Sequence, residues 1–164
     1  MPYPGLRPFA AEDAPLFFGR EAQVSALLRQ LEDHRFVAVV GSSGSGKSSL
    51  VRAGLLPAVR EGFLLGTTDW LVLFMRPGQY PYQGLARALD EATRPNGEAP
   101  IAAGEEASAT PGDALAVLRS TDRGLLLALA ETAIGPDCKV MVMVDQFEEL
   151  FAFRRTGALS LIHI

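Results

Sequence analysis

The chain has 164 residues, of which 48% are hydrophobic and 21% are charged. This composition is typical of a globular domain with a core and excludes an extended disordered chain. Fifteen basic and nineteen acidic side chains give a net charge of −4, so neither nucleic acid nor a membrane is expected as a direct partner.

The single cysteine excludes an intramolecular disulfide framework and a Cys-rich zinc site. No apolar run approaches the roughly 20 residues of a membrane span, and the first residues lack the layout of a signal peptide. A cytoplasmic setting is therefore expected.

The chain begins with a segment rich in proline, glycine and aromatic residues, at positions 1–19. Because prolines disfavour helix, this segment is predicted to be an extended arm held by its aromatic side chains. A helix is predicted next, since apolar residues recur there with helical spacing, at Val24, Leu27, Leu28 and Leu31.

Three short apolar runs, at 36–40, 70–75 and 140–144, predict strands buried on both faces. Helical patterns lie between and after them. The first helical pattern starts at Lys47, and Pro57 is expected to kink or end that helix. The other patterns cover 85–89, 113–134 (in two pieces) and 148–155. Residues 93–112 are predicted to be a long loop. Strands separated by helices indicate an α/β fold with a parallel sheet covered by helices on both faces.

The most informative motif is Gly-Ser-Ser-Gly-Ser-Gly-Lys-Ser at 41–48, which matches the phosphate-loop pattern G-x-x-x-x-G-K-[ST]. Glycines allow the backbone N–H groups to turn toward a phosphate, and the following helix adds its N-terminal amides. The lysine supplies positive charge to the β- and γ-phosphates, and the Ser48 hydroxyl is a ligand for Mg²⁺. The predicted nucleotide-binding residues of this segment are Gly41, Ser43, Gly44, Ser45, Gly46, Lys47, Ser48 and Ser49.

The third predicted strand ends in Asp145, where a phosphate-loop protein places the Walker B carboxylate that holds Mg²⁺ through water. A nearby acidic residue that polarises the attacking water is also expected. If the strand persists to residue 147, alternation places Glu149 on the face of Asp145; if a helix starts first, Glu148 turns back instead. Both acids also suit a solvated first helical turn, and Gln146 is a further candidate for orienting water.

Several ordered motifs together resemble the novel STAND NTPase group, signal-transduction ATPases of the AAA+-related branch. The resemblance covers residues 2 to about 153. Its motifs are Pro-Tyr-Pro-Gly-Leu-Arg-Pro-Phe at 2–9, Phe-Phe-Gly-Arg-Glu at 17–21, the phosphate loop, Arg-Ala-Gly-Leu-Leu-Pro at 52–57, Arg-Pro-Gly at 76–78 and Asp-Gln-Phe-Glu-Glu-Leu-Phe at 145–151.

The resemblance implies that Phe18, Gly19 and Arg20 contact the nucleotide at adenine, with simple core anchoring as the alternative for Phe18 and its neighbour Phe17. It also implies a switch in which ADP holds a closed state and ATP exchange permits self-assembly. Repeat or effector domains often follow the ATPase part in such proteins. A complete module would continue with further strands, a helical lid and a winged helix.

The sequence therefore predicts an arm at 1–21, a partial phosphate-loop NTPase core at 22–155 and a doubtful or truncated tail at 156–164. The expected function is Mg²⁺-dependent binding of ATP and ADP with slow ATP hydrolysis. The alternative is a nucleotide-binding scaffold without useful hydrolysis. A GTPase is disfavoured because the chain has no Asn-Lys-x-Asp element, whereas a small-molecule kinase stays open. For Arg76, at the end of the second predicted strand, a role in a structural turn is favoured over contact with phosphate or with a neighbouring subunit.

Overall fold

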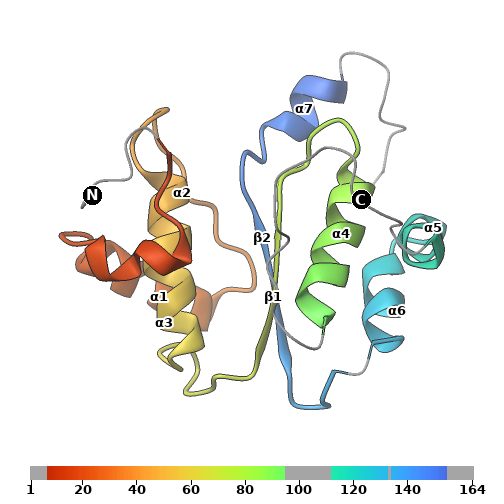
Figure 1. Cartoon of the computed structure of the whole chain (residues 1–164), viewed down its shortest axis with the longest axis horizontal. Helices are drawn as coiled ribbons and strands as arrows, with labels where there is room; N and C mark the ends of the chain where they lie inside the picture. Colours follow the sequence, from red (N-terminus) through yellow and green to blue (C-terminus); the bar gives the residue numbers. More distant parts are fainter. Residues whose placement is uncertain (1–6, 95–111, 133, 155–164) are drawn as a thin grey trace. The chain divides into compact units, whose positions relative to one another are not determined.

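The computed structural model describes residues 7–94, 112–132 and 134–154. It divides into two compact units, Met1–Trp70 and Leu71–Ile164 (Figure 1). Most of the predicted loop at 93–112 and the predicted tail at 156–164 lie outside the described residues. Within the described ranges, no helix combines the length and apolar character needed to cross a membrane.

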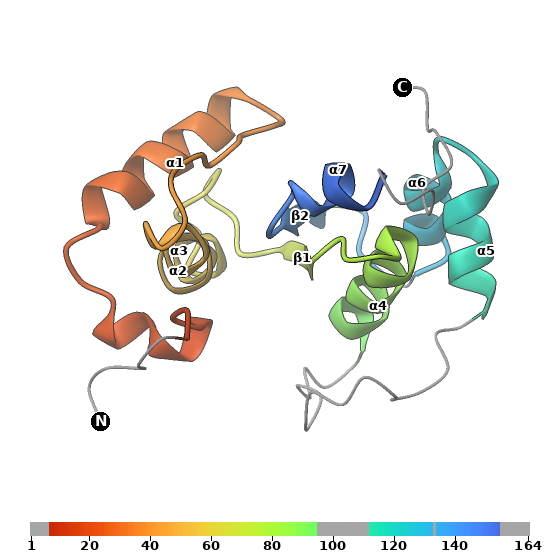
Figure 2. The same cartoon turned by 90° about the horizontal axis from the view of Figure 1, so that it is seen from above.

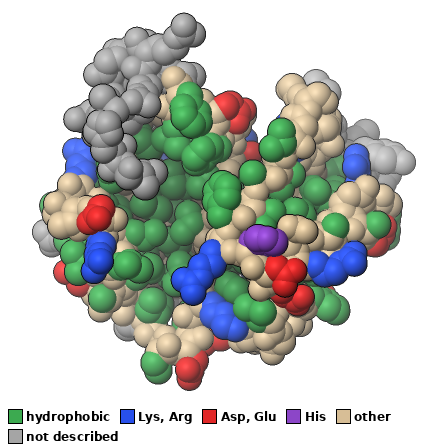
Figure 3. All heavy atoms as spheres, turned by 180° about the vertical axis from the view of Figure 1, so that it is seen from behind, with side chains coloured by type: hydrophobic (Ala, Val, Ile, Leu, Met, Phe, Trp, Pro, Cys, Tyr) green, Lys and Arg blue, Asp and Glu red, His purple; other side chains and the backbone are tan. Residues whose placement is uncertain are grey.

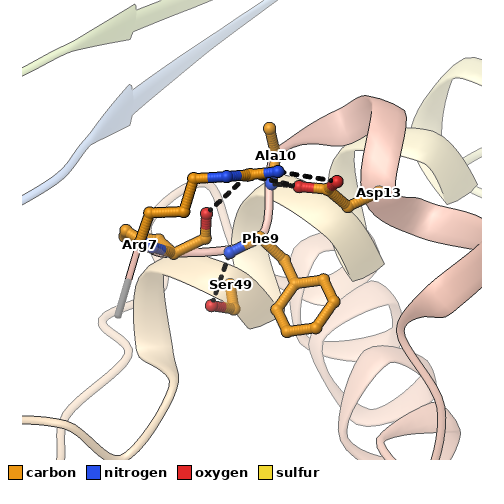
Figure 4. A network of polar contacts seen from close by, with 6 residues as sticks. Arg7, Phe9, Ala10, Asp13 and Ser49 are labelled. Atoms are coloured by element: carbon orange, nitrogen blue, oxygen red, sulfur yellow. Dashed lines mark hydrogen bonds and ion pairs between the residues drawn. The ribbon is translucent and has the colours of Figure 1, made fainter. Parts of the chain in front are cut away.

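The N-terminal arm of the first unit contains a 3₁₀ helix, η1 (Ala11–Leu16), so the prediction of an extended segment is wrong there. The Asp13 carboxylate accepts the Ala10 backbone N–H at 2.8 Å and so begins the helix, and Arg7 binds the same carboxylate at 2.6 and 3.0 Å (Figure 4). The predicted aromatic anchoring is confirmed, because the rings of Phe9 and Phe17 pack with their centroids 5.6 Å apart.

Helix α1 (Glu21–Asp33) forms as predicted, but the segment that follows it is not a strand. Residues 36–40 belong to no sheet, and the side chains of Phe36 and Val40 are 76% and 89% exposed. The prediction of a buried strand at 36–40 is therefore wrong for this structure. A strand needs a hydrogen-bonded neighbour, and apart from Trp70, which opens β1, the described residues of this unit contain no strand.

The helix after the phosphate loop runs without interruption through α2 (Lys47–Ser49), the π-helical segment η2 (Leu50–Leu55) and α3 (Leu56–Arg60). Pro57 does not end it. Pro57 is the second residue of α3 and follows directly on the π-helical segment, whose last turn is wider than an α-helical one. The buried side chains of this helix, all 8% exposed or less, are Ala53, Leu55, Leu56 and Val59.

The second unit contains a two-stranded sheet of β1 (Trp70–Met75) and β2 (Lys139–Val144). The residue after β2, Asp145, donates its N–H to the carbonyl of Met75 at 2.9 Å, so both strands end at the same edge and are parallel. Both predicted strands are confirmed. In β1, however, one face is buried and the other only half-buried. The prediction that both faces of this strand are buried is therefore not confirmed.

Helices α4 (Pro81–Thr93), α5 (Gly112–Ser120) and α6 (Gly124–Ala130) lie to one side of the strands (Figure 2). The split of the 113–134 pattern into two helices is thus confirmed, and α7 (Glu149–Arg154) follows β2 as expected. The core of this unit joins β1 to α4, α5 and α6 through Leu71, Leu73, Met75, Ala86, Leu89, Leu118 and Leu129. The observed fold is mixed, with a small parallel sheet, which agrees with the predicted α/β class at that level.

Charged side chains of both signs are interspersed with exposed hydrophobic ones on the face drawn in Figure 3. Large hydrophobic side chains at the surface include Phe18, Phe36, Val40 and Phe63. No single sign of charge dominates this face, as expected from the near balance of acidic and basic residues.

Candidate functional site

The phosphate loop has the backbone that its glycines were predicted to supply. Gly44 and Gly46 adopt left-handed conformations, with φ of 76° and 85°, which side chains with a Cβ rarely adopt. No heavy atom lies within 4 Å of the place where a Cβ would be built on either glycine. Gly44 and Gly46 therefore serve the backbone conformation, and the space beside them is open.

The side chain of Lys47 folds back onto the first residues of this loop. Its Nζ donates to the carbonyl oxygens of Gly41 at 2.8 Å and Ser42 at 2.9 Å. Ser45 N–H donates to the carbonyl of Ser42 at 3.3 Å, which forms the turn at the loop tip. These two bonds hold the ammonium group against the backbone of the first two loop residues.

Ser49 links the helix after the loop to the N-terminal arm. Its Oγ accepts the backbone N–H of Phe9 at 3.1 Å (Figure 4), a contact across 40 residues that the sequence does not signal. Ser48, the predicted metal ligand, is half-buried in the same turn.

The Phe-Phe-Gly-Arg-Glu segment presents its two aromatic residues differently. Phe17 packs against Phe9 and is half-buried, whereas Phe18 is 76% exposed. Core anchoring therefore applies to Phe17 and not to Phe18. Gly19 turns the chain with φ of 80° and donates its N–H to the Glu21 carboxylate at 2.9 Å. A hydrogen bond from the backbone of Glu21 itself, followed by the one from Gly19, lowers the pKa of Glu21. Arg20 is the residue before the first turn of α1.

A cavity of about 490 Å³ lies on the first unit between α1 and the segment after it, lined in part by Leu27, His34, Phe36 and Leu50. No residue of the phosphate loop and none of Phe18, Gly19 and Arg20 lines it.

In the second unit, Asp145 lies at the carboxyl end of β2 with its side chain only 12% exposed. The guanidinium of Arg76, the residue after β1, contacts Asp145 Oδ2 through Nε at 3.4 Å and Nη2 at 3.3 Å. The structure thus gives Arg76 an ion pair with the predicted metal ligand. Sequence reasoning missed this pair. The available signal was that both residues directly follow apolar runs, whose ends meet when the strands are parallel neighbours.

The chain turns sharply after Asp145, with Gln146 in a left-handed conformation at φ of 57°. The strand does not persist to residue 147, and α7 begins at Glu149. Glu149 accepts the backbone N–H of Gly78 at 3.0 Å, so it ties the turn after β2 to the loop after β1. Glu148 is exposed. The sequence left open a strand that persists to residue 147 or a helix that starts earlier, and the structure has the earlier helix. The hydrogen bond to the neighbouring loop is nevertheless made by Glu149 and not by Glu148.

Residues 2–160 match the family model described as Novel STAND NTPase 1. The chain therefore belongs to this family of NTPase modules, and the resemblance seen in the sequence is confirmed. Comparison with curated proteins and with solved structures finds no match.

Proposed function

We propose that this chain is the nucleotide-binding module of a STAND-type switch, which binds ATP and ADP together with Mg²⁺. The observation that carries the proposal is the phosphate loop at 41–48. In it two left-handed glycines leave open space, and Lys47 is held by two carbonyl oxygens. The family assignment supports the proposal, because NTPase modules bind nucleotides.

Each loop residue has a chemical role in this proposal. Backbone N–H groups from Gly41 to Ser49 surround the β-phosphate, and the first amides of the helix at 47–60 face the same charge. Lys47 exchanges a carbonyl contact for the β- and γ-phosphate oxygens, which a full positive charge binds more strongly than a neutral acceptor does. The exposed Phe18, with Gly19 and Arg20, contacts the adenine base.

The residues present fit a magnesium ion. Mg²⁺ usually takes one or two protein oxygens and completes its shell with phosphates and water. Ser48 and Asp145 offer a hydroxyl and a carboxylate, and Asp145 already attracts the cationic guanidinium of Arg76. Among the described residues no three His, Cys, Asp or Glu side chains converge, so a metal arriving with the nucleotide suits them better than a cage built by the protein. Bound Mg²⁺ would neutralise charge on the β- and γ-phosphates.

Slow hydrolysis is part of the proposal, with Glu148, Glu149 or Gln146 orienting the attacking water. A nucleotide-binding scaffold without useful hydrolysis is the second candidate. It is favoured by the hydrogen bond that engages Glu149 with Gly78. In either case further effector or repeat domains and nucleotide-dependent self-assembly would complete the switch.

The test is thermal melting with Mg-ATP, Mg-ADP and Mg-GTP. Ligand at about 100 times its Kd should add about 2.7 kcal/mol to the free energy of unfolding. Lys47→Ala should remove this gain for every nucleotide. Lys139→Ala is the matched control, because Lys139 is the only other lysine, and it should retain the gain.

Absence of any nucleotide effect on the intact protein would refute the proposal. An effect of GTP equal to that of ATP would refute adenine selectivity. Phosphate release, measured in the same samples, separates the two candidates, since a scaffold gains stability without releasing phosphate.

A further inference from the structure

The Arg76–Asp145 ion pair combines a fixed carboxylate with a loosely held cation. Both guanidinium contacts go to the same oxygen, Asp145 Oδ2, at 3.3 and 3.4 Å. Charged hydrogen bonds of full strength are shorter, about 2.7–2.9 Å, and arginine often uses both carboxylate oxygens. The Arg76 side chain is 48% exposed, against 12% for Asp145. Such a half-exposed, single-oxygen pair is weak and easily exchanged.

The backbone around this pair is firmly held. Asp145 N–H bonds to the carbonyl of Met75 at 2.9 Å, and Glu149 binds the N–H of Gly78 at 3.0 Å. Helix α4 approaches so closely that a Cβ on Gly84 would lie 2.9 Å from the carbonyl oxygen of Arg76. The guanidinium can therefore leave the carboxylate by rotation of its own side chain, without movement of either strand end.

We propose that Arg76 is an exchangeable counter-ion for Asp145, which neutralises the carboxylate when no metal is bound and yields it when Mg²⁺ arrives with the nucleotide. This inference rests on the proposed function. Two cations compete for one largely buried carboxylate, so Arg76 raises the Mg²⁺ concentration that the nucleotide-bound protein requires. Arg76 acts here as a positioning residue, because it works through Asp145.

The experiment is a Mg²⁺ titration at a fixed, saturating ADP concentration, read as the rise in melting temperature. Arg76→Gln should lower the Mg²⁺ midpoint by about two- to fivefold, the range that corresponds to an exposed ion pair. Arg76→Lys, which keeps the charge, should have a midpoint between those of the wild type and Arg76→Gln. Arg87→Gln is the matched control, since Arg87 is an exposed arginine within helix α4 and not at a strand end. Its midpoint should stay at the wild-type value.

A second arm repeats the Arg76→Gln comparison in an Asp145→Asn background, where the competition no longer exists and the midpoints should coincide. Melting in EDTA, without nucleotide, verifies that each variant folds. An unchanged or raised midpoint in Arg76→Gln would overturn the exchange while leaving nucleotide binding intact. A midpoint shift that persists in the Asp145→Asn background would also overturn it. A wild-type protein that shows no ADP effect would refute the proposed function, and the exchange with it.

Discussion

Gly54 lies inside the π-helical segment η2, where its effect on stability depends on packing. In a helix interior, replacing glycine by alanine normally stabilises a protein by about 0.5–1 kcal/mol. Here a Cβ on Gly54 would lie 2.7 Å from Val24 Cγ2 and 3.2 Å from Phe17 Cε1. Ordinary carbon contacts are about 3.5–4.0 Å, so the Val24 side chain, helix α1 or η2 would have to move.

Gly54→Ala should therefore destabilise the protein. Overpacking costs about 1–3 kcal/mol, which exceeds the gain in helix propensity and leaves a net loss of about 1 kcal/mol. For a chain of this size that loss lowers the melting temperature by about 2–4 °C. Urea unfolding followed by circular dichroism measures the same difference as a free energy.

The cause of the loss is tested by adding Val24→Ala, which removes the clashing methyl group. The double variant should be more stable than the sum of the two single effects predicts. Gly135→Ala is the control, because nothing lies within 4 Å of its Cβ position, and its effect should be near zero or slightly stabilising. A Gly54→Ala variant more stable than the wild type would refute the packing argument.

Two further predictions concern the core and the arm. Leu73→Ala, at a fully buried position of β1, should lower the free energy of unfolding by about 2–5 kcal/mol in urea titrations, and a loss below about 1 kcal/mol would contradict the burial. Arg7 and the Ala10 N–H hold the pKa of Asp13 below its ordinary 3.8. The ionised Asp13 carboxylate therefore stabilises the fold fully at a pH above the ordinary pKa of 3.8. This stabilisation is lost as the pH falls through the lower pKa of the folded state. Asp13→Asn should flatten the acid side of the melting temperature against pH curve, and an unchanged curve would show that the pair with Arg7 does not contribute.

Local sequence determines the parts of this structure that local chemistry controls. The run at 70–75 is apolar throughout and stops at Pro77 and Gly78, and β1 has the predicted bounds. Of the three loop glycines, Gly44 and Gly46 adopt positive φ. The turn of the loop depends on interactions within a few residues, whereas β1 also needs its distant neighbour β2.

The run at 36–40 has the same apolar pattern as β1 but has no neighbouring strand among the described residues of its own unit. A strand depends on such a neighbour as much as on its own residues. The Arg76–Asp145 pair joins residues 69 positions apart, so it follows from the sequence only once the two strands are known to be neighbours. Pro57 shows a third limit, since its effect depends on where the π-helical segment ends.

The π-helical segment also sets the rotation, about the helix axis, between the residues before it and the residues after it. In a regular α-helix each residue turns the chain by about 100°, and a π-helical turn accommodates extra backbone before the regular winding resumes. Gly46 and Lys47 lie before this segment, while Leu56 and Val59, which face the core, lie after it. The wide turn therefore fixes the direction in which the phosphate loop faces relative to the buried side of its own helix. Removing one residue from Leu50–Leu55 would rotate the loop around the helix axis and leave its sequence unchanged.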